Sequence, residues 1–239
     1  MAGLALARKR WTPSPTAQVD SSHPLASGLL GCWIGAGEGV WVNIVSGQGD
    51  LRAFTAQATS PVTPYGPSLG GGNLQQSASG QGQVTLDNRS LSMMVAGSVG
   101  PLAAELGNEF NITDLFGYST GSVGPFFRFG DSGRAEGKLQ FVVDNEKASD
   151  SVSLVKGDTL LAVGVSDASN VKLYHRGVRT VGGIAPAGSR TFLPGANAAY
   201  TSTARWSAHS ISIACIWNYP LPDAAIQALL DDPFCMLKG

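Results

Sequence analysis

The feature that most restricts the fold of this chain is a regular series of short apolar segments, each about four to eight residues long and bounded by turn-forming residues. Segments of this length and spacing are typical of the strands of a β-sandwich or β-barrel. The last segment alternates firmly apolar with smaller residues, which predicts a sheet that buries one face. The predicted strands are residues 29–34, 40–44, 51–54, 83–86, 91–97, 126–129, 139–143, 159–165, 171–175, 178–181 and 210–217.

Residues 223–230 predict one short helix near the C-terminus. This segment contains strong helix formers, and its apolar residues recur at helical spacing, so that they form one stripe. Pro222 suits the first turn, and Pro233 ends the helix because the residue before a proline disfavours helical geometry. Because Pro222 has no side-chain oxygen that could cap the helix, Asp223 is left as the expected capping residue.

Residues 1–27 predict an extended N-terminal arm, and residues 28–239 predict one sandwich domain. Pro13 and Pro15 fix the backbone and remove two hydrogen-bond donors, so this stretch is not a central strand. Such an arm packs along its own domain or reaches a neighbouring subunit, and the sequence leaves both alternatives open. The predicted partner-binding residues of the arm are Arg8, Lys9, Arg10 and Trp11, for which an ordinary solvated basic turn is the alternative.

The charge content is low. Charged residues make up 14% of the chain, and the formal net charge is −1, so no basic surface for nucleic acid is predicted. The low charge fits a surface partly buried against neighbouring subunits, and it equally fits an uncharged polar surface. No segment approaches the roughly 18 apolar residues of a membrane span, so no membrane insertion is predicted. Cys32, Cys215 and Cys235 are interpreted as buried free thiols in a chain that folds in a reducing compartment.

Three segments, in the right order, resemble laminin-G-like, concanavalin-A-like jelly-roll domains. Residues 216–226 (IWNYPLPDAAI) resemble the closing strand and short helix of these domains, and residues 171–178 (VKLYHRGV) resemble their hairpin. Residues 46–51 (SGQGDL) stand where the family has a Ser-Gly-Asn-Gly turn. With residues 23–29 (HPLASGL), Cys32 and Trp33, the chain resembles members carried by tailed bacteriophages and prophages. The resemblance implies an all-β, two-sheet antiparallel jelly-roll sandwich with an N-terminal arm and one C-terminal helix.

The family often carries an aspartate that can help to bind calcium, and this sequence departs from that pattern. Asn43 stands nearest to the position where the family often has an aspartate, and Ser212 and Ile213 replace an acidic pair in the last strand. Hard cations prefer several charged oxygen ligands. The sequence therefore predicts no cofactor, with calcium disfavoured by the missing carboxylates.

No set of residues predicts catalysis. Glycosidases of this shape need two carboxylates on one strand face, and their Glu-x-Asp-x-x-Glu pattern is absent. Asp144 and Glu146 share a face but lie in a polar, turn-rich stretch, so they are interpreted as loop carboxylates. His23, His175 and His209 lack the spacing of a metal site, and His175 and His209 are expected to be surface or capping residues. The chain is predicted not to be an enzyme.

Aromatic residues in or beside the loops rich in glycine and proline are candidates for binding a sugar or a partner. The alternative is that they cap the sandwich core. The candidates are Tyr65, Phe116, Tyr118, Phe126 and Phe127.

Two functional hypotheses follow. The first is a non-enzymatic virion structural protein, such as a capsid decoration, head-fibre or tail-associated subunit, that binds other virion proteins and forms a homo-oligomer. Such a protein is located in the virion and is made and folded in the cytoplasm of the bacterial host. The alternative is a lectin-like carbohydrate-binding module that recognises a glycan of the host surface.

Overall fold

The computed structural model describes residues 16–37, 40–45, 51–53, 62–67, 74–76, 84–100, 113–117, 125–131, 134–192 and 210–238. Nearly all of its regular elements are strands, joined by one short 3-10 helix and one α-helix in the part described. The elements are β1 (Gln18–Val19), η1 (Pro24–Ala26), β2 (Leu29–Gly37), β3 (Val40–Asn43), β4 (Leu51–Ala53), β5 (Val62–Thr63), β6 (Gly66–Pro67), β7 (Leu74–Gln76), β8 (Val84–Asp87), β9 (Leu91–Ser98), β10 (Thr113–Gly117), β11 (Pro125–Asp131), β12 (Arg134–Val143), β13 (Glu146–Ser153), β14 (Thr159–Ser166), β15 (Val171–His175), β16 (Val178–Val181), β17 (Ser189–Phe192), β18 (Ser210–Trp217), α1 (Asp223–Asp231) and β19 (Leu237–Lys238).

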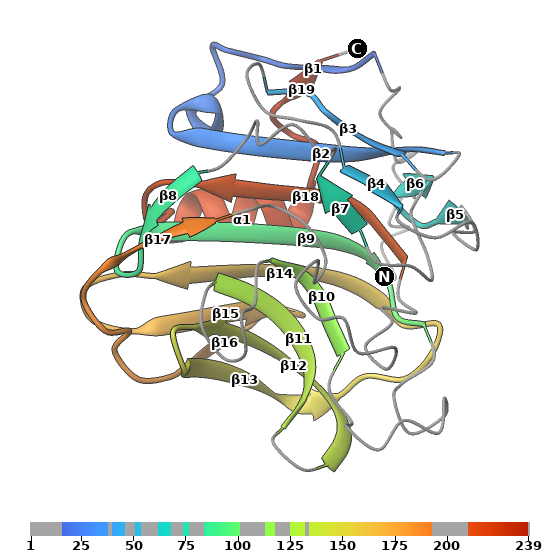
Figure 1. Ribbon diagram of the computed structural model, residues 1–239. Coiled ribbons are helices and arrows are strands. Elements are labelled where there is room, and N and C mark those ends of the chain that lie inside the picture. Colours follow the sequence, from blue (N-terminus) through green and yellow to red (C-terminus); the bar gives the residue numbers. More distant parts are fainter. Residues whose placement is uncertain are drawn as a thin grey trace, which may run out of the picture.

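Two antiparallel sheets form the sandwich (Figure 1). The large sheet has the order β16-β15-β14-β9-β18-β2-β3-β4-β7, and the small sheet has the order β10-β11-β12-β13. The last long strand, β18, lies between β9 and β2, so the two ends of the domain meet in the centre of the large sheet. Shorter strand pairs, β1-β19, β8-β17 and β5-β6, lie outside the two sheets. The prediction of a two-sheet antiparallel jelly-roll sandwich with one C-terminal helix is confirmed.

The central strands of the large sheet are buried on both faces. On one face Met93 and Val95 of β9 belong to the core between the two sheets, which includes Phe127 and Phe141 of the small sheet. On the opposite face Met94 of β9 packs in a second apolar cluster that contains residues of α1 and of the chain ends. Strands buried on both faces need near-continuous apolar sequence, and β9 and β18 have it.

A bulge in β18 changes which of its side chains lie on each face of the sheet, compared with the simple alternation seen in the sequence. Ile211 pairs with Gly97 and Ile213 with Ala96, so Ser212 is an extra residue in the strand. As a result Ile211 belongs to the core between the two sheets, whereas Ile213 belongs to the apolar cluster on the opposite face. Every residue of β18 is buried, so the prediction that this strand buries a single face is wrong.

Residues 16–27, the described part of the predicted arm, lie on the sandwich. Strand β1 pairs with β19 near the C-terminus, and Leu25 of η1 is buried in the cluster beneath α1. Residues 1–15, with Arg8, Lys9, Arg10 and Trp11, lie outside the described residues. In the part of the chain that the structure describes, no helix has the length and apolarity needed to cross a membrane.

Candidate functional site

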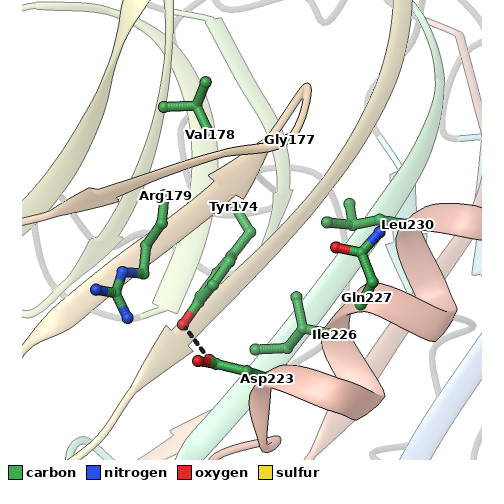
Figure 2. Close-up of a pocket in the computed structure, with 8 residues that line it drawn as sticks. All are labelled: Tyr174, Gly177, Val178, Arg179, Asp223, Ile226, Gln227 and Leu230. Atoms are coloured by element: carbon green, nitrogen blue, oxygen red, sulfur yellow. Dashed lines mark hydrogen bonds between the residues drawn. The ribbon is translucent and has the colours of Figure 1, made fainter.

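A hollow lies between the β15–β16 hairpin and α1 (Figure 2). It is on the face of the large sheet turned away from the small sheet, because Tyr174 and the buried residues of α1 belong to the same apolar cluster outside the core between the sheets. Its volume is about 240 Å³, below the roughly 300–1,000 Å³ of pockets for drug-sized ligands. Both polar and apolar side chains line it. The lining residues are Tyr174, Gly177, Val178, Arg179, Asp223, Ile226, Gln227 and Leu230.

Local sequence explains how the hairpin and the helix reach this arrangement. The hairpin turns over Arg176 and Gly177, whose φ angles of 52° and 73° are those of a two-residue turn that matches the twist of the strands. Beyond the turn, alternation along β15 directs Leu173 into the core and Tyr174 toward the helix. Helix α1 begins after Pro222, and its buried residues Ile226 and Leu229 hold it against the sheet.

Asp223 contacts the hairpin and does not cap its own helix. The N-cap of α1 is Pro222, without a side-chain capping bond, so the expectation that Asp223 caps the helix is wrong. Instead the Tyr174 hydroxyl donates a hydrogen bond of 2.9 Å to Asp223 Oδ1, as Figure 2 shows. Partial burial raises the pKa of the Tyr174 hydroxyl, and the bond to Asp223 raises it further, against the opposing effect of Arg179. The tyrosine therefore remains protonated and keeps its donor role at neutral pH.

A second hollow of about 240 Å³ adjoins the first and shares Gly177 and Leu230 with it. It brings in Tyr65, one of the aromatic residues that the sequence predicted as ligand contacts. Tyr65 is only 5% exposed, and its ring lies edge-on to Phe234 at 6.4 Å between centroids. Most of this ring is therefore core, and its remaining surface borders the hollow. The second hollow is lined by Tyr65, Thr159, Leu161, His175, Arg176, Gly177 and Leu230.

A buried ionisable pair lies close by, and the sequence did not predict it. His175 Nδ1 donates to Asp150 Oδ2 at 2.6 Å, from β15 across to β13. Burial lowers the pKa of His175, while the bond to Asp150 opposes that effect. Among the described residues, His175 Nε2 has no hydrogen-bond partner. The expectation of a surface histidine is wrong, because β15 turns His175 inward on the same face as Leu173.

The other aromatic candidates separate onto the two faces of the small sheet. Phe127 is fully buried between the sheets and packs on Phe141 at 5.0 Å between centroids. It is therefore part of the sandwich core, which was the alternative to binding a ligand or partner. Phe116 is also buried, against Trp33. Tyr118 lies outside the described residues.

Phe126 lies on the face of the small sheet opposite to Phe127. The Arg128 guanidinium is 5.5 Å from the centroid of its ring, and Arg128 Nε donates to Gln140 Oε1 at 2.7 Å. Phe126 and Gln140 are buried, and Gln140 Nε2 has no partner among the described residues. Phe126, Arg128 and Gln140 are all buried and leave no space for a ligand, whereas the hollow beside α1 is open to solvent. The hollow is therefore the better candidate for binding a ligand.

The positions that the resemblance linked to calcium have structural partners. Asn43 Oδ1 accepts hydrogen bonds from the backbone N–H groups of Cys32 and Val45. Ser212 Oγ lies 2.6 Å from Thr63 Oγ1. Across the residues described, no group of three or more His, Cys, Asp or Glu side chains is placed to hold a metal ion.

No family model and no curated protein sequence matches the chain. Among solved structures it is similar to the sialidase of Trypanosoma rangeli. The complex of that enzyme with sialic acid has 12% identity and a TM-score of 0.57, over 85% of this chain and 32% of the sialidase. The complex with the inhibitor DANA has 11% identity and a TM-score of 0.60, over 86% and 33%. The complex with a difluoro-KDN compound has 14% identity and a TM-score of 0.59, over 94% and 36%.

The chain thus spans about a third of the length of those sialidase chains. At this identity the likeness shows the fold alone. The fold is a lectin-like jelly-roll sandwich of the concanavalin-A-like kind, distantly similar to part of a carbohydrate-active enzyme. The bacteriophage part of the sequence resemblance stays a prediction.

Proposed function

We propose that this chain is a non-catalytic carbohydrate-binding module, and that the hollow between the β15–β16 hairpin and α1 holds one sugar unit. The observation that carries the proposal is the set of groups around this small space. A carboxylate, a guanidinium, a carboxamide and a phenol, from Asp223, Arg179, Gln227 and Tyr174, surround a hollow floored by Ile226 and Leu230.

This set matches the chemistry of a sugar ring. Each hydroxyl of a sugar is both donor and acceptor; Asp223 accepts, Arg179 donates and Gln227 does both. The apolar walls suit the C–H face of the ring, and Gly177 leaves room at the turn because no atom lies within 4 Å of the place a Cβ would occupy. The pair of Asp223 and Arg179 leaves the hollow without net charge, so neutral sugars fit it. An acidic sugar would find Arg179 as its partner.

The proposal is tested with the full chain on an array of immobilised neutral and sialylated oligosaccharides. Sialylated probes are included because the structurally similar sialidase was solved with sialic acid. We expect selective binding that falls at least tenfold in Arg179→Ala and Asp223→Asn. Lys156→Ala, in the exposed turn between β13 and β14, serves as the matched control and should bind like the wild type.

Thermal unfolding of each variant separates loss of the site from loss of the fold. Absence of selective binding by the wild type would refute the proposal, as would unchanged binding in both hollow variants. The virion structural role remains a second prediction. A wild type that binds no glycan and forms a symmetric homo-oligomer, measured by light scattering, would favour it.

A further inference from the structure

Two cysteines from opposite ends of the domain face each other in the large sheet. Cys32 of β2 and Cys215 of β18 are direct partners in the antiparallel register. Their Sγ atoms are 3.1 Å apart, and both side chains are fully buried in the cluster beneath α1. Both are free thiols, as the sequence predicted for the buried cysteines.

This geometry is close to that of a disulfide. Directly opposed residues on antiparallel strands have Cα atoms about 4.5–5.5 Å apart, within the roughly 4.4–6.8 Å that a disulfide requires. The sulfurs need to approach by about 1 Å to reach the S–S bond length. Side-chain rotation supplies that movement without a shift of either strand. We infer that Cys32 and Cys215 form an oxidisable dithiol site that takes a small-molecule disulfide, such as glutathione disulfide, as its oxidant.

The reaction is two thiol–disulfide exchanges. One protein thiolate attacks a sulfur of the oxidant and displaces one small thiol, which leaves a mixed disulfide on the protein. The second protein thiolate attacks the protein sulfur of that mixed disulfide and releases the second small thiol. The protein loses two protons and two electrons, and the oxidant gains them as it becomes two thiols.

Burial determines when the reaction takes place. Burial raises the pKa of the Cys215 thiol well above its ordinary value, and the neighbouring Cys32 raises it further. Little Cys215 thiolate therefore exists in the folded chain, and no reagent reaches a fully buried sulfur. The bond therefore forms during folding, when β2 and β18 bring the two cysteines together but before the two sulfurs are covered, and the redox conditions during folding select the form of the protein that persists.

Cys235 provides the internal comparison. It is half-buried, and burial together with Asp232 raises its pKa to about 11. It lies in the turn between α1 and β19 and is not paired in a sheet register with either of the other cysteines. It should remain a free thiol when the other two are joined.

The test is refolding of the full chain from guanidinium, once with reduced glutathione and once with a mixture of glutathione and glutathione disulfide. Alkylation in denaturant, intact mass and peptide mapping then count the thiols. After oxidative refolding we expect one alkylated cysteine, Cys235, and a bond between Cys32 and Cys215. The bond closes a loop with a sequence separation of 183 residues, so Tm should rise by about 5–15 °C over the reduced form.

Folded, reduced protein given the same oxidant should keep three alkylatable thiols over the same period. Cys235→Ser should still form the bond, and Cys215→Ser should not. Three free thiols after oxidative refolding, or a mapped bond that includes Cys235, would overturn the inference. Rapid oxidation of the folded protein would overturn the assignment of the reaction to folding.

Discussion

The two faces of the large sheet are covered in different ways. The inner face packs against the small sheet through side chains that are almost all apolar, such as Met93, Phe127 and Phe141. The outer face packs against α1, η1 and the segment after β18, and there polar atoms of the sheet bond to the covering chain. Trp217 Nε1 donates to Leu25 O at 2.8 Å, and Ser92 Oγ donates to Tyr219 O at 2.9 Å.

The difference follows from the backbone of the covering layer. A second sheet satisfies its own N–H and C=O groups, so apolar contact is sufficient between two sheets. Chain ends and short helices leave backbone groups without regular partners, and burying them requires side-chain donors and acceptors. Leu221 N, which donates to Ser92 Oγ at 2.8 Å, is such a group. Packing should therefore dominate stability on the inner face, and individual hydrogen bonds should have measurable effects on the outer face.

The largest effect is expected for Phe141→Ala on the inner face. The ring is fully buried, packs on Phe127 and covers Gly164, so its removal leaves a cavity that the two sheets cannot close. We expect the free energy of unfolding to fall by about 3–5 kcal/mol. Urea denaturation measures the change, and Val178→Ala, at a half-exposed position, should remain within about 0.5 kcal/mol of the wild type. A loss below about 1 kcal/mol for Phe141→Ala would contradict the role of packing.

The next prediction concerns the close fit between Phe141 and Gly164. A Cβ at Gly164 would lie 2.3 Å from Phe141 Cγ, so Gly164→Ala should cost about 1–3 kcal/mol through overpacking. The same substitution in the Phe141→Ala background should cost much less, because the clashing ring is gone. The coupling free energy of this double-mutant cycle is the measurement. Additive effects would show that the two residues do not meet.

Central strands of the sheets could be predicted from the sequence better than edge strands. The central strands β9, β14 and β18 were predicted within about two residues, because strands buried on both faces are continuously apolar. Strand β13 was missed, since its sequence EKASDSVS is polar. It is an edge strand that turns only Ala148 and Asp150 inward, so it carries little apolar signal.

The candidate site was less predictable than the fold, because it depends on pairing between distant segments. Tyr174 meets Asp223, and His175 meets Asp150, only after β15, β13 and α1 have been placed. No spacing along the chain encodes these contacts. The resemblance did identify both the hairpin and the helix that border the hollow, although it assigned neither of them to ligand binding. The predicted aromatic residues were chosen for lying near loops, and Phe127 shows that such a position is compatible with full burial.

On the outer face, Trp217→Phe removes one hydrogen bond and keeps most of the ring. Leu25 O would lose its indole donor inside the cluster, and leaving a buried acceptor without a partner costs about 1–3 kcal/mol. Urea denaturation of the variant measures the cost. The comparison variant is Trp33→Phe, which makes the same change of residue type on the inner face and removes part of a ring from the core between the two sheets. A change below about 0.5 kcal/mol for Trp217→Phe would mean that the hydrogen bonds of the outer face do not stabilise it.

The His175–Asp150 pair predicts a dependence of stability on pH at the rim of the inner face. Because burial lowers the pKa of His175 in the folded state, the unfolded chain binds the proton more readily. Stability from this group is complete above the ordinary pKa of 6.5 and is lost as the pH falls from there through the folded pKa. One proton contributes at most about 1.4 kcal/mol per pH unit. Urea midpoints between pH 7.5 and 5 should decline in the wild type more steeply than in His175→Gln; equal slopes would contradict this assignment.

The smallest effect on stability is expected at the hollow itself, for Tyr174→Phe. The hydroxyl bond to Asp223 is exposed to solvent at its rim, where water replaces a lost partner, so the variant should lose no more than about 0.5–1 kcal/mol. Binding should respond differently, because without the hydroxyl Asp223 is no longer held toward the hairpin. We expect glycan affinity to fall severalfold in titration calorimetry while the urea midpoint stays nearly constant. A large loss of stability with unchanged affinity would make Tyr174 part of the packing of the outer face and would remove it from the proposed binding site.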